Sequence, residues 1–198
     1  MPDAVLILPC PAALPAFRAA LERGWSPTTV RAEPARQALL RRLAEDAEAV
    51  LREMEDPDGS GPPVVLPDGT AVPRLPGITR WIWDAAAGED GFCGTISLRW
   101  QAGTEVLPPH VLGHVGYVLV PERRGLGHAT VALRALLPEA RRRGLRWVEL
   151  VTDPGNLASQ RVIGRCGGIL VERFRKTASH GGAEALRFRI PTPALPPS

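Results

Sequence analysis

A glycine-rich segment near the middle of the chain has the residue types that bind phosphate. Arg124, Gly125 and Gly127 lie between an apolar run and a stretch with apolar residues at helical spacing. Glycine lets the backbone turn sharply and approach a ligand, and the first amides of a helix present unpaired N–H groups at the positive end of its dipole. This pattern predicts an anion site, and a pyrophosphate is the matching ligand.

Two common nucleotide motifs do not describe this segment. A Walker loop requires Gly-Lys-Ser/Thr, and a Rossmann fingerprint requires the order Gly-x-Gly-x-x-Gly with a later acidic residue, and neither is present. A structural alternative stays open, in which the two glycines only make a tight strand-to-helix connection.

The elements that must position this turn can be predicted from periodicity and from Gly and Pro. The sequence indicates a mixed α/β fold: helices, then an antiparallel meander, then strand-helix-strand-helix-strand. We expect strands near residues 4–8, 79–84, 92–100, 113–120, 146–151, 169–175 and 185–190, and helices near 13–23, 33–56, 128–143 and 157–166. Residues 57–76 are rich in Pro and Gly and predict an inserted hairpin closed by Asp68-Gly69.

Composition limits the class of protein. The 198 residues are 44% hydrophobic and 23% charged, which is typical of one globular domain spanning residues 1–198. The net charge of +3 is spread over scattered arginines, so we expect no nucleic-acid partner. No run approaches the roughly 18 apolar residues of a membrane span. Three cysteines without metal or disulfide spacing favour a reducing cytoplasm and no bound metal.

The same segment resembles a known family. Arg124-x-x-Gly127-x-Ala129 is similar to the Gln/Arg-x-x-Gly-x-Gly/Ala motif of the GNAT N-acetyltransferase superfamily. The resemblance extends to 113–121, which is similar to the family's fourth strand, and to 156–168, which is similar to its second conserved block and ends in Gly-Gly as in an uncharacterised bacterial subgroup. It covers roughly residues 80–175 and implies a GNAT-like fold: a central, mostly antiparallel sheet of about seven strands with splayed fourth and fifth strands, flanked by about four helices.

The resemblance also implies an activity and a cofactor. The family transfers an acetyl group from acetyl-CoA to an amine. Carried over by position, backbone groups on the fourth strand run alongside the pantetheine arm, amides of the turn hold the pyrophosphate, and an asparagine contacts the cofactor near its reactive end. The residues implied to bind acetyl-CoA are Tyr117, Val118, Leu119, Arg124, Gly125, Leu126, Gly127, His128, Ala129, Thr130 and Asn156.

The chain departs from the family at two catalytic positions. The tyrosine often found seven residues after the asparagine is Ile163 here, and the glutamate found in some relatives five residues before it is Val151. The proton for the thiolate then comes from water or from another hydroxyl, and Tyr117 and Ser159 are candidates. Ser159 has an alternative role within the first helical turn.

His114 is the candidate general base, because an imidazole can accept a proton at neutral pH. A hydrogen-bonded structural histidine is the alternative. Cys166 lacks a neighbouring histidine, so we interpret it as a small buried residue. Tryptophans 81, 83 and 100 on the predicted strands suit core packing more than substrate stacking.

Function is therefore predicted as acetyl transfer from acetyl-CoA to a primary amine by direct transfer in a ternary complex. The acceptor stays open between a peptide or protein amine and a small amine, including an antibiotic. A non-catalytic acyl-CoA-binding regulatory protein is the alternative, because both side-chain catalysts are missing. A two-fold homodimer is the default expectation for assembly.

Overall fold

The computed structural model describes residues 3–66, 69–177 and 180–194. The chain divides into two compact units. The first comprises residues 1–56, 78–97 and 117–135, and the second comprises 57–77, 98–116 and 136–198. Each unit gathers segments that are far apart in the sequence, so residues near the N-terminus share a core with residues from the middle of the chain.

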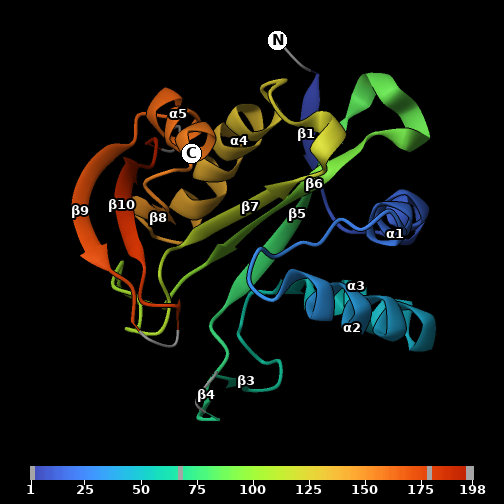
Figure 1. Ribbon diagram of the computed structural model, residues 1–198, viewed down its shortest axis with the longest axis horizontal. Coiled ribbons are helices and arrows are strands. Elements are labelled where there is room, and N and C mark those ends of the chain that lie inside the picture. Colours follow the sequence, from blue (N-terminus) through green and yellow to red (C-terminus); the bar gives the residue numbers. More distant parts are fainter. Residues whose placement is uncertain (1–2, 67–68, 178–179, 195–198) are drawn as a thin grey trace. The chain divides into compact units, whose positions relative to one another are not determined.

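The larger sheet has the strand order β1-β5-β6-β7 (Figure 1). The short strand β2 also pairs with β5 in this sheet. Its strands are β1 (Ala4–Ile7), β2 (Glu55–Asp56), β5 (Gly77–Asp84), β6 (Phe92–Arg99) and β7 (Val115–Leu119). β1 is antiparallel to β5, with Ala4 opposite Asp84. The three strands predicted after the insertion are neighbours in chain order, as the meander requires.

An aromatic cluster forms the centre of the first unit. Phe17 of α1 (Leu14–Glu22) stacks on Trp81 of β5, with ring centroids 4.8 Å apart. Trp25, just after α1, meets Phe92 of β6 edge-on at 5.3 Å. These four side chains are at most 5% exposed, and offset or edge-on aromatic pairs of this kind add to the stability gained from burial. Trp81 is therefore a core residue, as the sequence favoured.

The helix predicted from residue 33 to 56 is interrupted, and the prediction of one helix was wrong. α2 (Ala32–Glu45) and α3 (Ala47–Glu53) meet at Asp46, whose backbone is extended (φ −153°, ψ 91°). The Asp46 carboxylate accepts a hydrogen bond of 2.8 Å from the amide of Ala49. Aspartate competes with helical backbone bonds in this way, so it begins a new helix where apolar periodicity alone suggests continuation.

The second unit contains an antiparallel three-stranded sheet of order β8-β10-β9. Its strands are β8 (Trp147–Thr152), β9 (Ile169–Arg175) and β10 (Glu184–Pro191), and Leu150 lies opposite Phe188. The helix α5 (Leu157–Arg165) follows β8. α4 (His128–Arg142) begins in the first unit, ends in the second and continues through Pro138.

The inserted hairpin is present as two short strands. β3 (Val64–Val65) pairs with β4 (Ala71–Val72), with Val64 opposite Val72. The Pro67 and Asp68 part of the predicted turn lies outside the described residues, while Gly69 has a positive φ of 85°. The mixed α/β class is confirmed, and among the described residues the strand that the sequence did not predict is the short β2.

Candidate functional site

The glycine-rich turn connects β7 to α4 within the first unit. A 3-10 turn (Pro121–Arg123) follows β7, and α4 begins at His128. Gly125 and Gly127 have φ values of 76° and 91°, a left-handed conformation that favours glycine. The amides of Thr130 and Val131 both donate to the Gly127 carbonyl. The N–H groups before them lie at the beginning of the helix and have no intrahelical acceptor, which is the arrangement that binds anions.

Two arginines fix this turn through main-chain and ionic contacts. Both Nε and Nη2 of Arg124 donate to the carbonyl oxygen of Leu119 at 3.2 Å, which ties the turn to the last residue of β7. Arg123 pairs with Asp84 at 3.0 Å and donates to the carbonyl of Asp90 at 3.2 Å. These contacts of Arg123 and Arg124 hold the beginning of the turn against β7, Asp84 and Asp90.

The backbones of β6 and β7 approach each other closely at Gly94. A Cβ at this position would lie 2.2 Å from the Val118 oxygen and 2.7 Å from the Cα of Leu119. The φ of Gly94 is 143°, and the amide of Val120 donates to the carbonyl of Cys93 nearby. This contact sets the position of the strand segment 117–119 that the sequence assigned to the cofactor.

His128 contributes to the turn mainly as a buried residue. Its side chain is 2% exposed, and among the described residues its Nδ1 has no hydrogen-bond partner. Burial lowers the pKa of the imidazole, because desolvation disfavours the charged form. A neutral ring packed at the start of α4 leaves the backbone amide, and not the side chain, as the group available to an anion.

A cavity of about 420 Å³ lies beside this turn within the first unit. Its walls come from the segment 23–29 after α1 and from the segment 118–124 at the end of β7. Lining side chains include Arg23, Ser26, Thr28, Glu122 and Arg124. The first wall could not be predicted from the sequence, because a short polar loop between two helices carries no motif that shows what it packs against.

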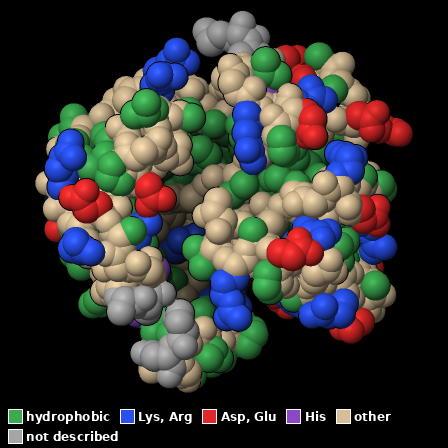
Figure 2. Space-filling view, in the orientation of Figure 1, with side chains coloured by type: hydrophobic (Ala, Val, Ile, Leu, Met, Phe, Trp, Pro, Cys, Tyr) green, Lys and Arg blue, Asp and Glu red, His purple; other side chains and the backbone are tan. Residues whose placement is uncertain are grey.

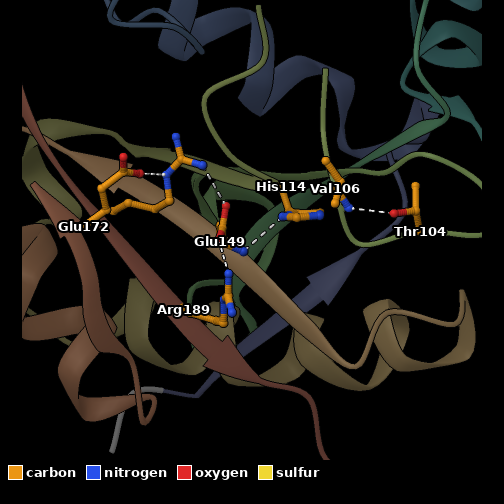
Figure 3. Close-up of polar contacts among 7 residues, drawn as sticks. Thr104, Val106, His114, Glu149, Glu172 and Arg189 are labelled. Carbon is orange, nitrogen blue, oxygen red and sulfur yellow. Dashed lines mark hydrogen bonds and ion pairs between the residues drawn. The ribbon is translucent and has the colours of Figure 1, made fainter. Parts of the chain in front are cut away.

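His114, in the second unit, is fully buried (Figure 3). Its Nδ1 accepts a hydrogen bond of 3.0 Å from the amide of Glu149, and its ring meets Trp147 edge-on. Burial is the main cause that lowers the pKa of His114 to about 4. These contacts favour the structural alternative for His114, while its role as a base stays a prediction.

The carboxylate of Glu149 is held by two arginines on the neighbouring strand (Figure 3). Arg189 donates to it at 2.8 Å and Arg187 at 3.1 Å. Glu149 is 6% exposed, so the buried charge is paired as burial requires. This network fixes β8 against β10 next to His114, and the sequence analysis did not identify it.

Asn156 and Ser159 lie together at the start of α5 in the second unit. The Asn156 side chain accepts a hydrogen bond of 3.0 Å from the backbone amide of Ser159, which caps the helix. Ile163, at the position of the family's tyrosine, is 0% exposed, and a Cβ on Gly168 would lie 2.3 Å from its side chain. A core aliphatic residue therefore occupies the place of the missing acid.

The structure brings residues 117–119 and 124–130 together in the first unit, whereas His114, Asn156 and Ser159 belong to the second. Tyr117 is half-buried.

Figure 2 shows Lys and Arg side chains dispersed among acidic and apolar ones on the face displayed. In the described part of the chain, no helix is long and apolar enough to cross a membrane, and no three potential metal ligands gather at one place.

Comparison with known protein families identifies one matching family. A family model described as an acetyltransferase (GNAT) domain matches residues 37–169. No curated protein sequence matches the chain significantly.

Among solved structures, the chain is similar to the microcin C7 self-immunity acetyltransferase MccE in complex with acetyl-CoA and AMP. The TM-score is 0.60 at 13% identity, over 96% of this chain and 92% of that chain. It is also similar to RimL, a ribosomal L7/L12 alpha-N-protein acetyltransferase in complex with coenzyme A (TM-score 0.59, 14% identity, 96% and 94% covered). The ribosomal-protein-S5-alanine acetyltransferase from Vibrio fischeri has a TM-score of 0.55 at 19% identity, with 98% and 94% covered. At these identities the likeness shows a shared fold.

Proposed function

The chain belongs to the GNAT acetyltransferase family, and we propose that it transfers an acetyl group from acetyl-CoA to a primary amine by direct transfer in a ternary complex. The observation that carries this proposal is the turn between β7 and α4. Two left-handed glycines and the opening amides of α4 form an anion site whose position is fixed by Arg124 on the Leu119 carbonyl.

The residues of the turn fit a pyrophosphate. A Cβ at Gly125 would meet no atom within 4 Å, so space for a ligand lies over the turn. Backbone amides from Gly125 to Ala129 would hold the phosphates, which the helix dipole and the nearby guanidinium of Arg124 favour. The Thr130 amide donates to the Gly127 carbonyl, so it would contribute only if that bond is shared with a phosphate oxygen. Residues 117–119 would lie along the pantetheine arm, and Asn156 near its reactive end.

Acetyl transfer has three requirements: a polarised thioester carbonyl, a positioned amine and a proton for the thiolate. The Leu119 amide would polarise the thioester carbonyl, and the fixed position of β7 against Gly94 keeps that donor in place. The acceptor must be a neutral amine when it attacks, held beside the strand, and proximity alone supplies a large part of the rate. Tyr117, Ser159 or water would provide the proton for the departing thiolate, since Ile163 has none to give.

His114 would be a weak base in this scheme. With a pKa near 4 the ring is neutral at pH 7 and can accept a proton, but it holds that proton poorly. Because Nδ1 accepts the Glu149 amide, the neutral ring carries its proton on Nε2, and the only nitrogen with a lone pair is already hydrogen-bonded. A rate that keeps its pH profile in a His114→Gln variant would exclude His114 as the base.

A thiol-release assay with acetyl-CoA, run over peptides, polyamines and aminoglycosides, tests the proposal. Calorimetry with coenzyme A on the same preparation measures cofactor binding independently. We expect cofactor binding and release with one acceptor class. Absence of coenzyme A binding would contradict the proposal, and tight binding without release across the panel would favour a regulatory protein instead.

A further inference from the structure

Two charged side chains of opposite sign line the cavity beside the glycine-rich turn between β7 and α4, which we call the phosphate turn, and they do not pair with each other. Arg23 caps the C-terminal end of α1, and Glu122 lies in the 3-10 turn after β7. Both side chains are exposed, and among the described residues neither forms a side-chain hydrogen bond or an ion pair. Other arginines of the first unit do pair, such as Arg36 with Glu33 and Arg123 with Asp84.

The cavity is positively charged as a whole. Arg23 and Arg124 contribute two guanidinium groups, and Glu122 contributes one carboxylate. Arg124 is directed onto the Leu119 carbonyl and does not neutralise Glu122. Because Arg124 is proposed to face the phosphates of acetyl-CoA, Arg23 and Glu122 are the charges left for an acceptor, and a ligand with one ammonium and one anionic group would satisfy both signs.

Hydrogen bonds within the segment and from α2 stabilise the wall that carries Arg23. The Ser26 hydroxyl accepts the Thr28 amide at 3.4 Å, and the Thr28 hydroxyl accepts the Val30 amide at 3.1 Å. Arg36 of α2 donates to the carbonyl of Leu21, the last part of α1 before this segment. A preorganised wall reduces the entropy that ligand binding must overcome.

The cavity also reaches the strand segment where acetyl transfer is proposed. Val118 lies in its lining and belongs to the 117–119 segment assigned to the pantetheine arm. We propose that this cavity binds an acceptor whose amine has a carboxylate a few bonds away, a proposal that rests on the acetyltransferase function proposed above. Arg23 would hold the carboxylate, and Glu122 would attract the amine. Free amino acids and acidic peptide N-termini both have this chemistry.

Acetyl transfer to such an acceptor exchanges the carbon–sulfur bond of acetyl-CoA for a carbon–nitrogen bond. The amine reaches the site as an ammonium drawn by Glu122 and loses one proton to solvent water before it attacks. Its nitrogen then forms a bond to the acetyl carbon while the carbon–sulfur bond breaks, the nitrogen loses a second proton, and the thiolate gains one. The acceptor's carboxylate takes no part in bond making, so Arg23 acts through binding.

Steady-state thiol release at saturating acetyl-CoA tests this inference with matched acceptors. Glutamate is compared with its diamide and with spermidine, and a peptide beginning with Asp is compared with one beginning with Asn. We expect kcat/KM for the carboxylate member of at least one pair to be about tenfold higher, as one charge-assisted contact allows. The pair that shows the difference identifies the source, free amino acid or peptide.

Variants separate binding from a general loss of function. Arg23→Gln should remove the preference through KM, with the affinity for coenzyme A unchanged within about twofold. Arg41→Gln, an exposed arginine on α2 outside the cavity, is the matched control and should change nothing. Glu122→Gln should lower kcat/KM for every amine.

The outcomes distinguish the two proposals. Turnover that favours spermidine or the amides, or a preference that survives Arg23→Gln, would overturn this inference and leave the acetyltransferase proposal standing. No binding of coenzyme A, or no release with any amine, would overturn both.

Discussion

At the scale of single residues, Arg124 has the most direct influence on the proposed cofactor site. Its two hydrogen bonds to Leu119 join the phosphate turn to the strand that would run along the pantetheine arm. The sequence motif places an arginine or glutamine here, and the structure supplies a reason, because either side chain can donate to a main-chain carbonyl. The residue therefore connects two parts of one binding surface.

Replacing Arg124 with Met should weaken coenzyme A binding about tenfold. The variant loses a charged donor to the Leu119 oxygen and a positive charge near the phosphates, and a hydrogen bond to a charged group contributes about 1.5–3 kcal/mol, of which solvent exposure screens part. Calorimetry measures the change in Kd. Arg41→Met removes an equivalent charge from α2, and a similar loss of affinity there would show that only overall charge matters.

His114 gives the protein a dependence of stability on pH. Its folded pKa is about 4, below its ordinary value of 6.5, so between these values the unfolded chain binds the extra proton and the folded chain does not. The free energy of unfolding therefore rises with pH across this window, and acidification from pH 7 to pH 5 should cost about 2 kcal/mol from this residue.

Denaturant unfolding at pH 7 and pH 5 tests this expectation. A His114→Leu variant should lose most of the difference between the two pH values, even if it is less stable at both. His110→Gln, at a histidine in the loop before Gly113, should keep the difference. A pH dependence that is equal in all three proteins would show that His114 does not cause it.

At the scale of elements, the close approach of β6 to β7 at Gly94 determines where β7, the strand proposed to contact the cofactor, lies. Gly94→Ala would place a Cβ 2.2 Å from the Val118 oxygen at a φ of 143°, so the strands must separate. We expect a loss of about 2–4 kcal/mol in the free energy of unfolding, together with weaker coenzyme A binding.

Gly164→Ala is the matched control for this change. Gly164 lies on the exposed side of α5, and a Cβ there would meet nothing within 4 Å. Alanine should stabilise the helix by about 0.5–1 kcal/mol. If both variants were equally stable, the close approach at Gly94 would have no energetic consequence.

Elements also show what the sequence can and cannot predict. The meander, the turn and α5 follow from apolar period, glycine and a capping asparagine, all of which are local signals. The break at Asp46 was missed because its apolar neighbours keep helical spacing on both sides. The cavity wall at 23–29 was missed because what a loop packs against is decided by tertiary contacts, here the aromatic cluster around Trp25.

At the scale of the whole molecule, the chain is expected to behave as one domain although it divides into two compact units. α4 and the larger sheet both contain residues of each unit, so the covalent chain crosses between them within regular elements. Units connected in this way are expected to unfold together, because fraying one of them breaks hydrogen bonds in an element they share.

Coenzyme A should therefore stabilise segments of both units. At one hundred times its Kd, a ligand that binds only the folded state raises the free energy of unfolding by about 2.7 kcal/mol. Hydrogen exchange of residues 92–97 in the first unit and 147–152 in the second should slow by similar factors, since both strands exchange through the same global opening. In Arg124→Met, with a tenfold weaker Kd, the gain should fall to about 1.4 kcal/mol in both segments. Protection confined to residues 92–97 would instead mean that the units open independently, and that the phosphate turn stabilises only its own unit.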